Sequence, residues 1–166
     1  MVKFFKILSQ NPSQTKKIGK ILAREILGGR LTKKVYPVGS RRDSCGALVL
    51  GLVGDLGGGK TTFLQGFAKG LGIKEKILSP SFVILRRFEI KDLRFKNFYH
   101  IDCYRISKPK EILDLGFKEI ISDPKNIIAI EWADRIKKIL PKKILILKFD
   151  FINHQNQRKI EILNYV

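Results

Sequence analysis

The sequence has few of the residues that hold disulfide-rich or zinc-binding domains together. Its 166 residues include two cysteines, Cys45 and Cys103, and two histidines, His100 and His154. Two cysteines do not make the disulfide framework of a small secreted domain, and these four side chains do not predict a four-ligand zinc site. We expect both cysteines to be inert thiols, because free cysteine is among the most frequently buried residue types.

Long hydrophobic runs are also missing. The longest apolar stretches, "ALVLGLV" at 47–53 and "IIAI" at 127–130, are much shorter than the ~20 residues that a membrane-spanning helix needs. Near the N-terminus, Lys3 and Lys6 interrupt the apolar residues, so no signal-peptide core is visible. We therefore expect a cytoplasmic protein without a membrane partner.

Acidic residues are scarce. The chain has 15 Asp and Glu against 33 Lys and Arg, which gives a formal net charge of +18. Such a balance favours polyanionic partners, above all nucleic acid, because phosphate attraction does not depend on sequence. The basic residues are scattered along a chain rich in Lys and Ile, as an AT-biased genome would produce. Charge alone leaves both interpretations open.

The chain has the size and composition of one globular domain. Hydrophobic residues make up 44% of it and aromatic residues 10%, which is typical of a folded protein. A length of 166 residues fits a single core, so we expect one domain over residues 1–166. The segment 28–46 is rich in Gly and basic residues and has no apolar period. It predicts a long basic loop, either flexible or used as a contact surface.

Strand-like and helix-like segments alternate along the rest of the chain. In the segment 11–27, Ile18, Leu22 and Ile26 recur along one helical face, and Asn11 or Ser13 can cap the start. The expected strands cover 3–9, 47–53, 81–90, 95–106, 126–132, 142–151 and 158–165. The expected helices cover 11–27, 60–71, 108–121 with a break at Gly116, and 133–140. This order predicts a three-layer α/β domain with helices on both faces of a mixed sheet, whose core is parallel and whose remaining strands are antiparallel.

The stretch "GDLGGGKTT" at 54–62 carries the chemistry. Gly54, Gly59, Lys60 and Thr61 match the pattern G-x-x-x-x-G-K-[ST], with a buried strand before and a helix after, so the domain is P-loop NTPase-like. Glycines let the backbone N–H groups point inward around a phosphate, and the helix N-terminus adds its positive end. Lys60 would reach the β- and γ-phosphate oxygens, and the Thr61 hydroxyl would sit on a magnesium ion. The residues expected to bind the nucleotide here are Gly54, Asp55, Leu56, Gly57, Gly58, Gly59, Lys60, Thr61 and Thr62.

Two acidic residues end apolar strands and are candidates for the metal and the water. Glu131 ends "NIIAIE", and Asp102 ends "NFYHID". Glu131 is the better metal partner, because a short and wholly apolar strand is central in a parallel sheet. Asp102 would orient the attacking water or a metal-bound water. Either residue on its own is also compatible with a solvated carboxylate at a strand end.

The ordered set of motifs resembles the TsaE (YjeE-type) ATPases, which support threonylcarbamoyladenosine (t6A) formation on tRNA. The motifs are "GDLGGGKTT", "SPSF" at 79–82, "HIDCYRI" at 100–106, "EILDLGFKEI" at 111–120 and "IEWAD" at 130–134. The resemblance implies an ATP loop at 54–61, Thr61 and Glu131 as magnesium ligands, and a catalytic set of Lys60, Asp102 and Glu131. It also implies that Trp132 lies beside the nucleotide, Thr15 near its base and Ser81 in a nucleotide-sensing switch.

Four features leave room for other interpretations. Trp132 could be an ordinary packing aromatic, and Thr15 a plain helix-start residue. The third residue of "SPS", Ser81, keeps the hydroxyl of the family's usual threonine but loses its methyl group. The family usually joins its first helix to the P-loop strand by a short turn, and the basic loop at 28–46 is much longer.

The resemblance implies a magnesium-dependent ATPase that is slow alone and works as an accessory subunit. Its partners would be TsaB and TsaD homologues, with tRNA approached indirectly through that complex, and TsaD performing the threonylcarbamoyl transfer. Two alternatives remain: a small-molecule or nucleoside kinase, and an RNA-binding module regulated by a nucleotide. The sequence has no N-K-x-D motif that would select GTP.

Overall fold

The computed structural model describes residues 2–29, 46–78, 83–152 and 156–165. Most of the expected loop at 28–46 and the predicted switch residue Ser81 lie outside these ranges. Along the chain the elements are β1 (Val2–Ser9), α1 (Pro12–Leu27), β2 (Leu48–Val53), α3 (Lys60–Gly70), β3 (Leu85–Glu89), β4 (Asn97–Asp102), α4 (Pro109–Leu113), α5 (Phe117–Ser122), β5 (Asn126–Glu131), the 3-10 helix η2 (Ala133–Ile139), β6 (Ile144–Phe151) and β7 (Arg158–Tyr165).

The strands form one mixed sheet in the order β1-β7-β6-β2-β5-β4-β3. Strand β2 pairs in parallel with β6 and β5, and β5 pairs in parallel with β4. The outer pairs, β1 with β7, β7 with β6, and β3 with β4, are antiparallel. This arrangement confirms the expected parallel core with antiparallel strands. It also confirms that β5, which ends in Glu131, is central.

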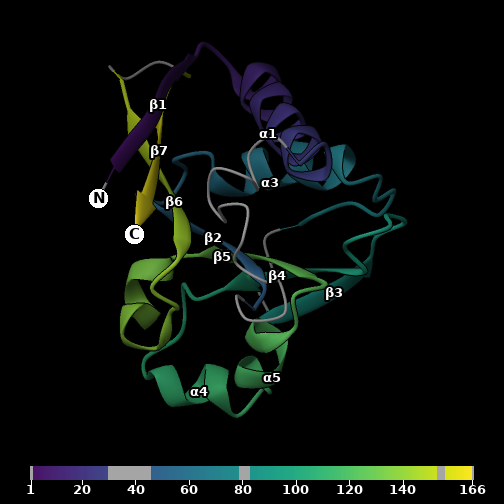
Figure 1. Ribbon diagram of the computed structural model, residues 1–166. Helices are drawn as coiled ribbons and strands as arrows, with labels where there is room; N and C mark the ends of the chain where they lie inside the picture. Colours follow the sequence, from purple (N-terminus) through teal and green to yellow (C-terminus); the bar gives the residue numbers. More distant parts are fainter. Residues whose placement is uncertain (1, 30–45, 79–82, 153–155, 166) are drawn as a thin grey trace.

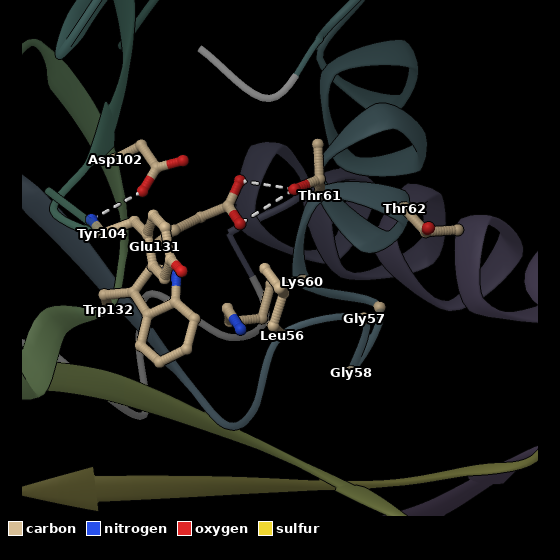
Figure 2. Close-up of a pocket in the computed structure, with 11 residues that line it drawn as sticks. Leu56, Gly57, Gly58, Lys60, Thr61, Thr62, Asp102, Tyr104, Glu131 and Trp132 are labelled. Carbon is tan, nitrogen blue, oxygen red and sulfur yellow. Dashed lines mark hydrogen bonds between the residues drawn. The ribbon is translucent and has the colours of Figure 1, made fainter. Parts of the chain in front are cut away.

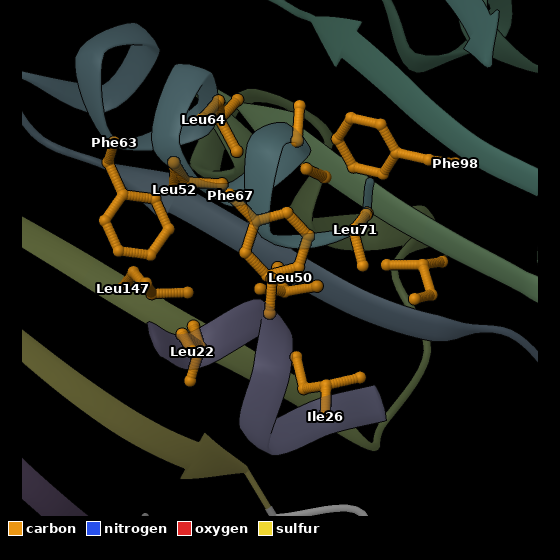
Figure 3. Close-up of a cluster of buried hydrophobic side chains, with 14 of the residues drawn as sticks. Leu22, Ile26, Leu50, Leu52, Phe63, Leu64, Phe67, Leu71, Phe98 and Leu147 are labelled. Carbon is orange, nitrogen blue, oxygen red and sulfur yellow. The ribbon is translucent and has the colours of Figure 1, made fainter. Parts of the chain in front are cut away.

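Helices cover both faces of the sheet, as Figure 1 shows, with α1 and α3 on one side and α4 and α5 on the other. The alternation along β2 explains why both faces are apolar. Leu50 and Leu52 pack toward α1 and α3, while Val49 packs in the second cluster with residues of α4, α5 and η2. Figure 3 shows the first cluster, in which Phe63 and Phe67 of α3 lie between the sheet and α1.

Glycines let α1 and α3 approach each other closely. A Cβ atom on Gly66 of α3 would collide with the backbone carbonyl of Lys16 in α1. A Cβ atom on Gly19 of α1 would likewise meet the backbone of Phe63 and lie 2.9 Å from the amide nitrogen of Phe67. The close contact fixes α1 beside α3, the helix that begins at Lys60, so it places α1 beside the P-loop.

Several expected element bounds differ from the structure. The segment 108–121 is two short helices separated at Gly116, the expected break, which adopts a left-handed conformation. The expected helix at 133–140 is the 3-10 helix η2, with a non-helical residue at Ile136. Strand β4 ends at Asp102 and β5 at Glu131, the two acids expected at strand ends, and the residues after each acid that fell in the expected ranges 95–106 and 126–132 are not part of the strands. Across the described ranges, no helix is both long and apolar enough to cross a membrane.

Candidate functional site

The P-loop, residues 54–61, joins β2 to α3 and curls through glycine conformations. Gly54 has φ 136°, and a Cβ atom there would collide with the carbonyl of Phe149 on β6. Gly59, with φ 98°, stands at the N-cap of α3, so no side chain caps the first turn of that helix. An uncapped helix start preceded by a curled loop is a favourable place for an anion such as phosphate.

Lys60 is buried inside this loop, with 4% of its surface exposed. Its Nζ atom donates hydrogen bonds to the carbonyl oxygens of Gly54, at 2.6 Å, and Asp55, at 2.8 Å. Burial lowers the pKa of the Lys60 ammonium below its ordinary value of 10.5, while nearby carboxylates, with Glu131 first, oppose that shift. A desolvated cation held in the loop attracts a phosphate more strongly than a solvated one.

Glu131 meets Thr61 at the opening of the loop. The Thr61 hydroxyl lies 3.0 Å from Oε1 and 2.9 Å from Oε2 of Glu131 and donates to the carboxylate. Asp102 ends the neighbouring strand, directly opposite Glu131 in the parallel register, and its Oδ1 accepts the backbone N–H of Tyr104 at 2.9 Å. Strand order therefore brings the two predicted acids and the predicted metal-binding hydroxyl to one place.

Trp132 follows Glu131 and turns its ring over Lys60. It is the one non-glycine residue with positive φ, 58°, among the described residues. The Lys60 Nζ atom lies 4.0 Å from the ring centroid, and the Tyr104 ring packs against Trp132 with centroids 5.2 Å apart. The Arg135 guanidinium lies 5.5 Å from the centroids of both rings. Trp132 thus contacts the P-loop lysine directly.

These residues line a cavity of about 200 Å³ (Figure 2), in which Glu131 and Thr61 point toward each other. Its lining consists of Leu56, Gly57, Gly58, Gly59, Lys60, Thr61, Thr62, Asp102, Tyr104, Glu131 and Trp132. Of the residues predicted to bind the nucleotide, Gly54 and Asp55 contribute the carbonyls that hold Lys60 and are not part of this lining. Ser81 lies outside the described residues.

Thr15 is close to the P-loop but is engaged within the fold. Its hydroxyl lies 2.8 Å from the hydroxyl of Ser9 and also donates to the carbonyl of Asn11 at 3.3 Å. Its methyl group is 3.8 Å from the position that a Cβ atom on Gly59 would take. Asn11 is the N-cap of α1, so Thr15 lies one turn into the helix. The geometry supports the plain structural interpretation and leaves the nucleotide contact a prediction.

Two residues at the site were not expected from the sequence. His100 is fully buried and its Nε2 atom lies 2.9 Å from Oε1 of Glu131. Arg158 comes from β7, donates to the carbonyl of Gly57 at 3.1 Å, and stacks 4.3 Å from the centroid of the Phe151 ring. The spacing of His100, two residues before Asp102, places both on one face of a strand, but the contact of His100 with Glu131 depends on strand order. Nothing in the local sequence points to Arg158.

The donor set fits a magnesium ion bound together with a nucleotide. Among the residues that the structure describes, no three His, Cys, Asp or Glu side chains gather into a metal centre. Magnesium bound with phosphates takes only one or two oxygen ligands from the protein and completes its shell with water and phosphate oxygens. The Thr61 hydroxyl and the Glu131 carboxylate are oxygen donors of that kind, beside a loop shaped for phosphate.

A strand, a P-loop and a helix set in a mixed sheet define an α/β protein of the P-loop NTPase-like class. The crystal structure of YdiB from Bacillus subtilis has this fold, with a TM-score of 0.71 and 28% sequence identity. The match covers 100% of this chain and 89% of YdiB. The expected fold class is therefore confirmed.

Sequence comparison identifies the family. The family model "Threonylcarbamoyl adenosine biosynthesis protein TsaE" matches residues 9–160. Two proteins named tRNA threonylcarbamoyladenosine biosynthesis protein TsaE are similar to the chain. That of Bacillus subtilis is 36% identical over 135 residues, covering 81% of this chain and 70% of the relative. That of Rickettsia felis is 30% identical over 158 residues, covering 95% and 78%. The chain belongs to the TsaE family, which confirms the resemblance seen in the motifs.

Proposed function

We propose that this chain is a magnesium-dependent ATPase that acts as an accessory subunit in t6A formation on tRNA. The names of the family and of the relatives tie them to threonylcarbamoyladenosine biosynthesis. The observation that carries the ATPase part is the pair of Thr61 and Glu131, whose hydrogen bonds of 2.9 and 3.0 Å stand next to the buried Lys60. P-loop proteins that catalyse phosphoryl transfer use a lysine for the phosphates and a hydroxyl and a carboxylate for magnesium, and all three side chains are present here.

Each residue has a distinct part in the proposed reaction. Lys60 and the backbone N–H groups of the P-loop bind and orient the β- and γ-phosphates. Thr61 and Glu131 hold the magnesium ion, which supplies positive charge against the phosphate oxygens. Asp102, buried beside Glu131, orients the attacking water. Trp132 and Tyr104 cover the site with aromatic surface and restrict the access of bulk water.

The proposed partners are homologues of TsaB and TsaD, and turnover by the isolated chain is expected to be slow. The exposed face of α1 supports an approach to tRNA on that complex, because it carries Lys16, Lys17, Lys20 and Arg24. Four cations on one helix would attract RNA phosphates at moderate salt concentration. In this proposal the chain does not itself modify the tRNA.

The test is ATP hydrolysis by the wild-type chain, Glu131→Gln and Asp102→Asn, each alone and with purified TsaB and TsaD homologues. Glu119→Gln, an exposed carboxylate on α5, is the matched control. We expect slow turnover alone, faster turnover with the partners, and a loss of about 10²-fold or more in both site variants, with Glu119→Gln unchanged. A turnover rate that does not change with the partners, together with transfer of phosphate to a metabolite, would favour a kinase instead. Salt-sensitive RNA binding without any ATP turnover, even with the partners, would favour an RNA-binding module.

A further inference from the structure

His100 contacts the Glu131 carboxylate in the interior of the protein. The Nε2 atom of the ring lies 2.9 Å from Oε1, and the two side chains are 1% and 3% exposed. Their strands, β4 and β5, are parallel neighbours in which His100 pairs with Ala129 and Asp102 pairs with Glu131. Because side chains alternate along a strand, His100, Asp102 and Glu131 all project from the sheet face that α3 covers.

The position of the hydrogen on the imidazole follows from its two nitrogen atoms. Nε2 faces a carboxylate oxygen, which only accepts hydrogen bonds, so Nε2 must carry a hydrogen. Nδ1 is buried and has no hydrogen-bond partner among the described residues. The geometry therefore points to a hydrogen on Nε2, the nitrogen that faces the carboxylate.

This bond changes how Glu131 is held. Apart from His100, the Glu131 side chain accepts hydrogen bonds from the Thr61 hydroxyl. Thr61 is itself the other residue proposed to ligate magnesium, so its contact with Glu131 must adjust when the ion binds. His100 lies on β4, an interior strand of the sheet, and its contact with Glu131 does not involve Thr61. Groups that hydrogen-bond a metal-binding carboxylate fix its orientation, and their loss typically weakens metal binding or activity.

We propose that His100 is a positioning residue for the magnesium site: its Nε2–H group fixes the Glu131 carboxylate in the orientation that binds the ion. The inference rests on the proposed function, because it assumes that Glu131 serves magnesium. His100 touches neither nucleotide nor ion. It acts only through Glu131, so its removal should affect the magnesium-dependent part of nucleotide binding and leave the magnesium-independent part alone.

The first test measures the binding of a non-hydrolysable ATP analogue by calorimetry, with and without magnesium. The variants are His100→Leu, which removes the donor, and His100→Gln, whose amide nitrogen can replace Nε2–H. His154→Gln, at the other histidine of the chain, is the control. For His100→Leu we expect the affinity for the analogue without magnesium to be unchanged. The factor by which magnesium raises that affinity, called the magnesium gain here, should fall about 10- to 100-fold. His100→Gln should recover most of that gain, and His154→Gln should match the wild type.

The second test needs no nucleotide and leaves His100 in place. In the folded, ¹⁵N-labelled His154→Gln variant, His100 is the remaining histidine, and its ring nitrogens can be assigned by NMR. We expect the hydrogen on Nε2. The opposite tautomer, or a full magnesium gain in folded His100→Leu, would overturn the inference while leaving the ATPase proposal standing. Failure of the wild type to bind the analogue at all would instead overturn the proposed function.

Discussion

The ammonium group of Lys60 lies 4.0 Å from the centre of the Trp132 ring. The same ammonium donates to the carbonyls of Gly54 and Asp55, so the P-loop and the residue after Glu131 hold it from two sides. A phosphate in the P-loop would draw the Lys60 ammonium toward its oxygens and change the contacts of the ammonium with these carbonyls and with the ring. The environment of Trp132 is therefore coupled to occupation of the P-loop.

We expect nucleotide binding to change the fluorescence of Trp132, which is the one tryptophan in the chain. Displacement of a cation from the face of an indole ring alters its surroundings directly. Titration of the wild type with ADP should give a saturable change, and adenosine, which has no phosphate, should give none. An equal response to adenosine would show that the signal does not come from Lys60. Trp132→Phe should remove the signal while calorimetry still detects binding.

Substitution of Gly66 by alanine should destabilise the protein severely, because the new Cβ atom would collide with the backbone of Lys16 in the adjoining helix. Overpacking against backbone forces the helices apart, and we expect a loss of about 3 kcal/mol in the free energy of unfolding. Urea denaturation of the two proteins measures this difference.

Gly72→Ala is the matched control for that substitution. Gly72 has φ 84°, but a Cβ atom there would have nothing within 4 Å. Its substitution should cost only the strain of a left-handed conformation, about 1 kcal/mol. If the two variants lost the same free energy of unfolding, α1 and α3 would be less closely packed at Gly66 than in the structure.

The parts of the site that were predictable from the sequence are local. The P-loop is a contiguous pattern, and Glu131 and Asp102 each end a strand that can be recognised by its apolar residues. Parallel strands place their C-terminal ends at one edge of the sheet, so the meeting of these residues with Thr61 followed from the fold class. The roles of these residues with nucleotide and magnesium stay predictions.

The parts that could not be predicted depend on strand order and register. His100 reaches Glu131 only because β4 lies next to β5 with Asp102 opposite Glu131. Arg158 reaches Gly57 only because β7 joins the sheet beside β6. The role of Gly19 and Gly66 appears only when α1 and α3, which are distant in sequence, pack together. The expected strand 126–132 extends one residue past the end of β5, because the backbone of Trp132 adopts a left-handed conformation.

Cys103 should be unreactive in the native protein. Burial, assisted by the Asp102 carboxylate, raises the pKa of its thiol to about 12, and thiolate is the reactive form. In a Cys45→Ser variant, Cys103 is the remaining thiol. We expect Ellman's reagent at pH 8 to label it only after denaturation. Labelling of the native variant within minutes would mean that the segment after Asp102 opens readily.

The last prediction concerns Asp150, whose carboxylate lies 2.9 Å from the Lys159 ammonium on β7 and 3.3 Å from that of Lys148. The hydrogen bond from Lys159 lowers the pKa of Asp150 below its ordinary value of 3.8. A carboxyl group whose pKa is lower in the folded state stabilises the fold at pH values above 3.8. That stabilisation is lost as the pH falls through the lowered value.

Asp150→Asn should therefore reduce the free energy of unfolding at pH 7, with a small effect because the ion pair is partly exposed to solvent. The difference from the wild type should shrink as the pH falls below 3.8 and disappear once the wild-type carboxyl is protonated. Thermal melts at pH 7 and near pH 2.5 measure both. A double-mutant cycle with Lys159→Met isolates the pair from its surroundings. A difference that stays constant over this range would assign the effect of the substitution to β6–β7 packing rather than to charge.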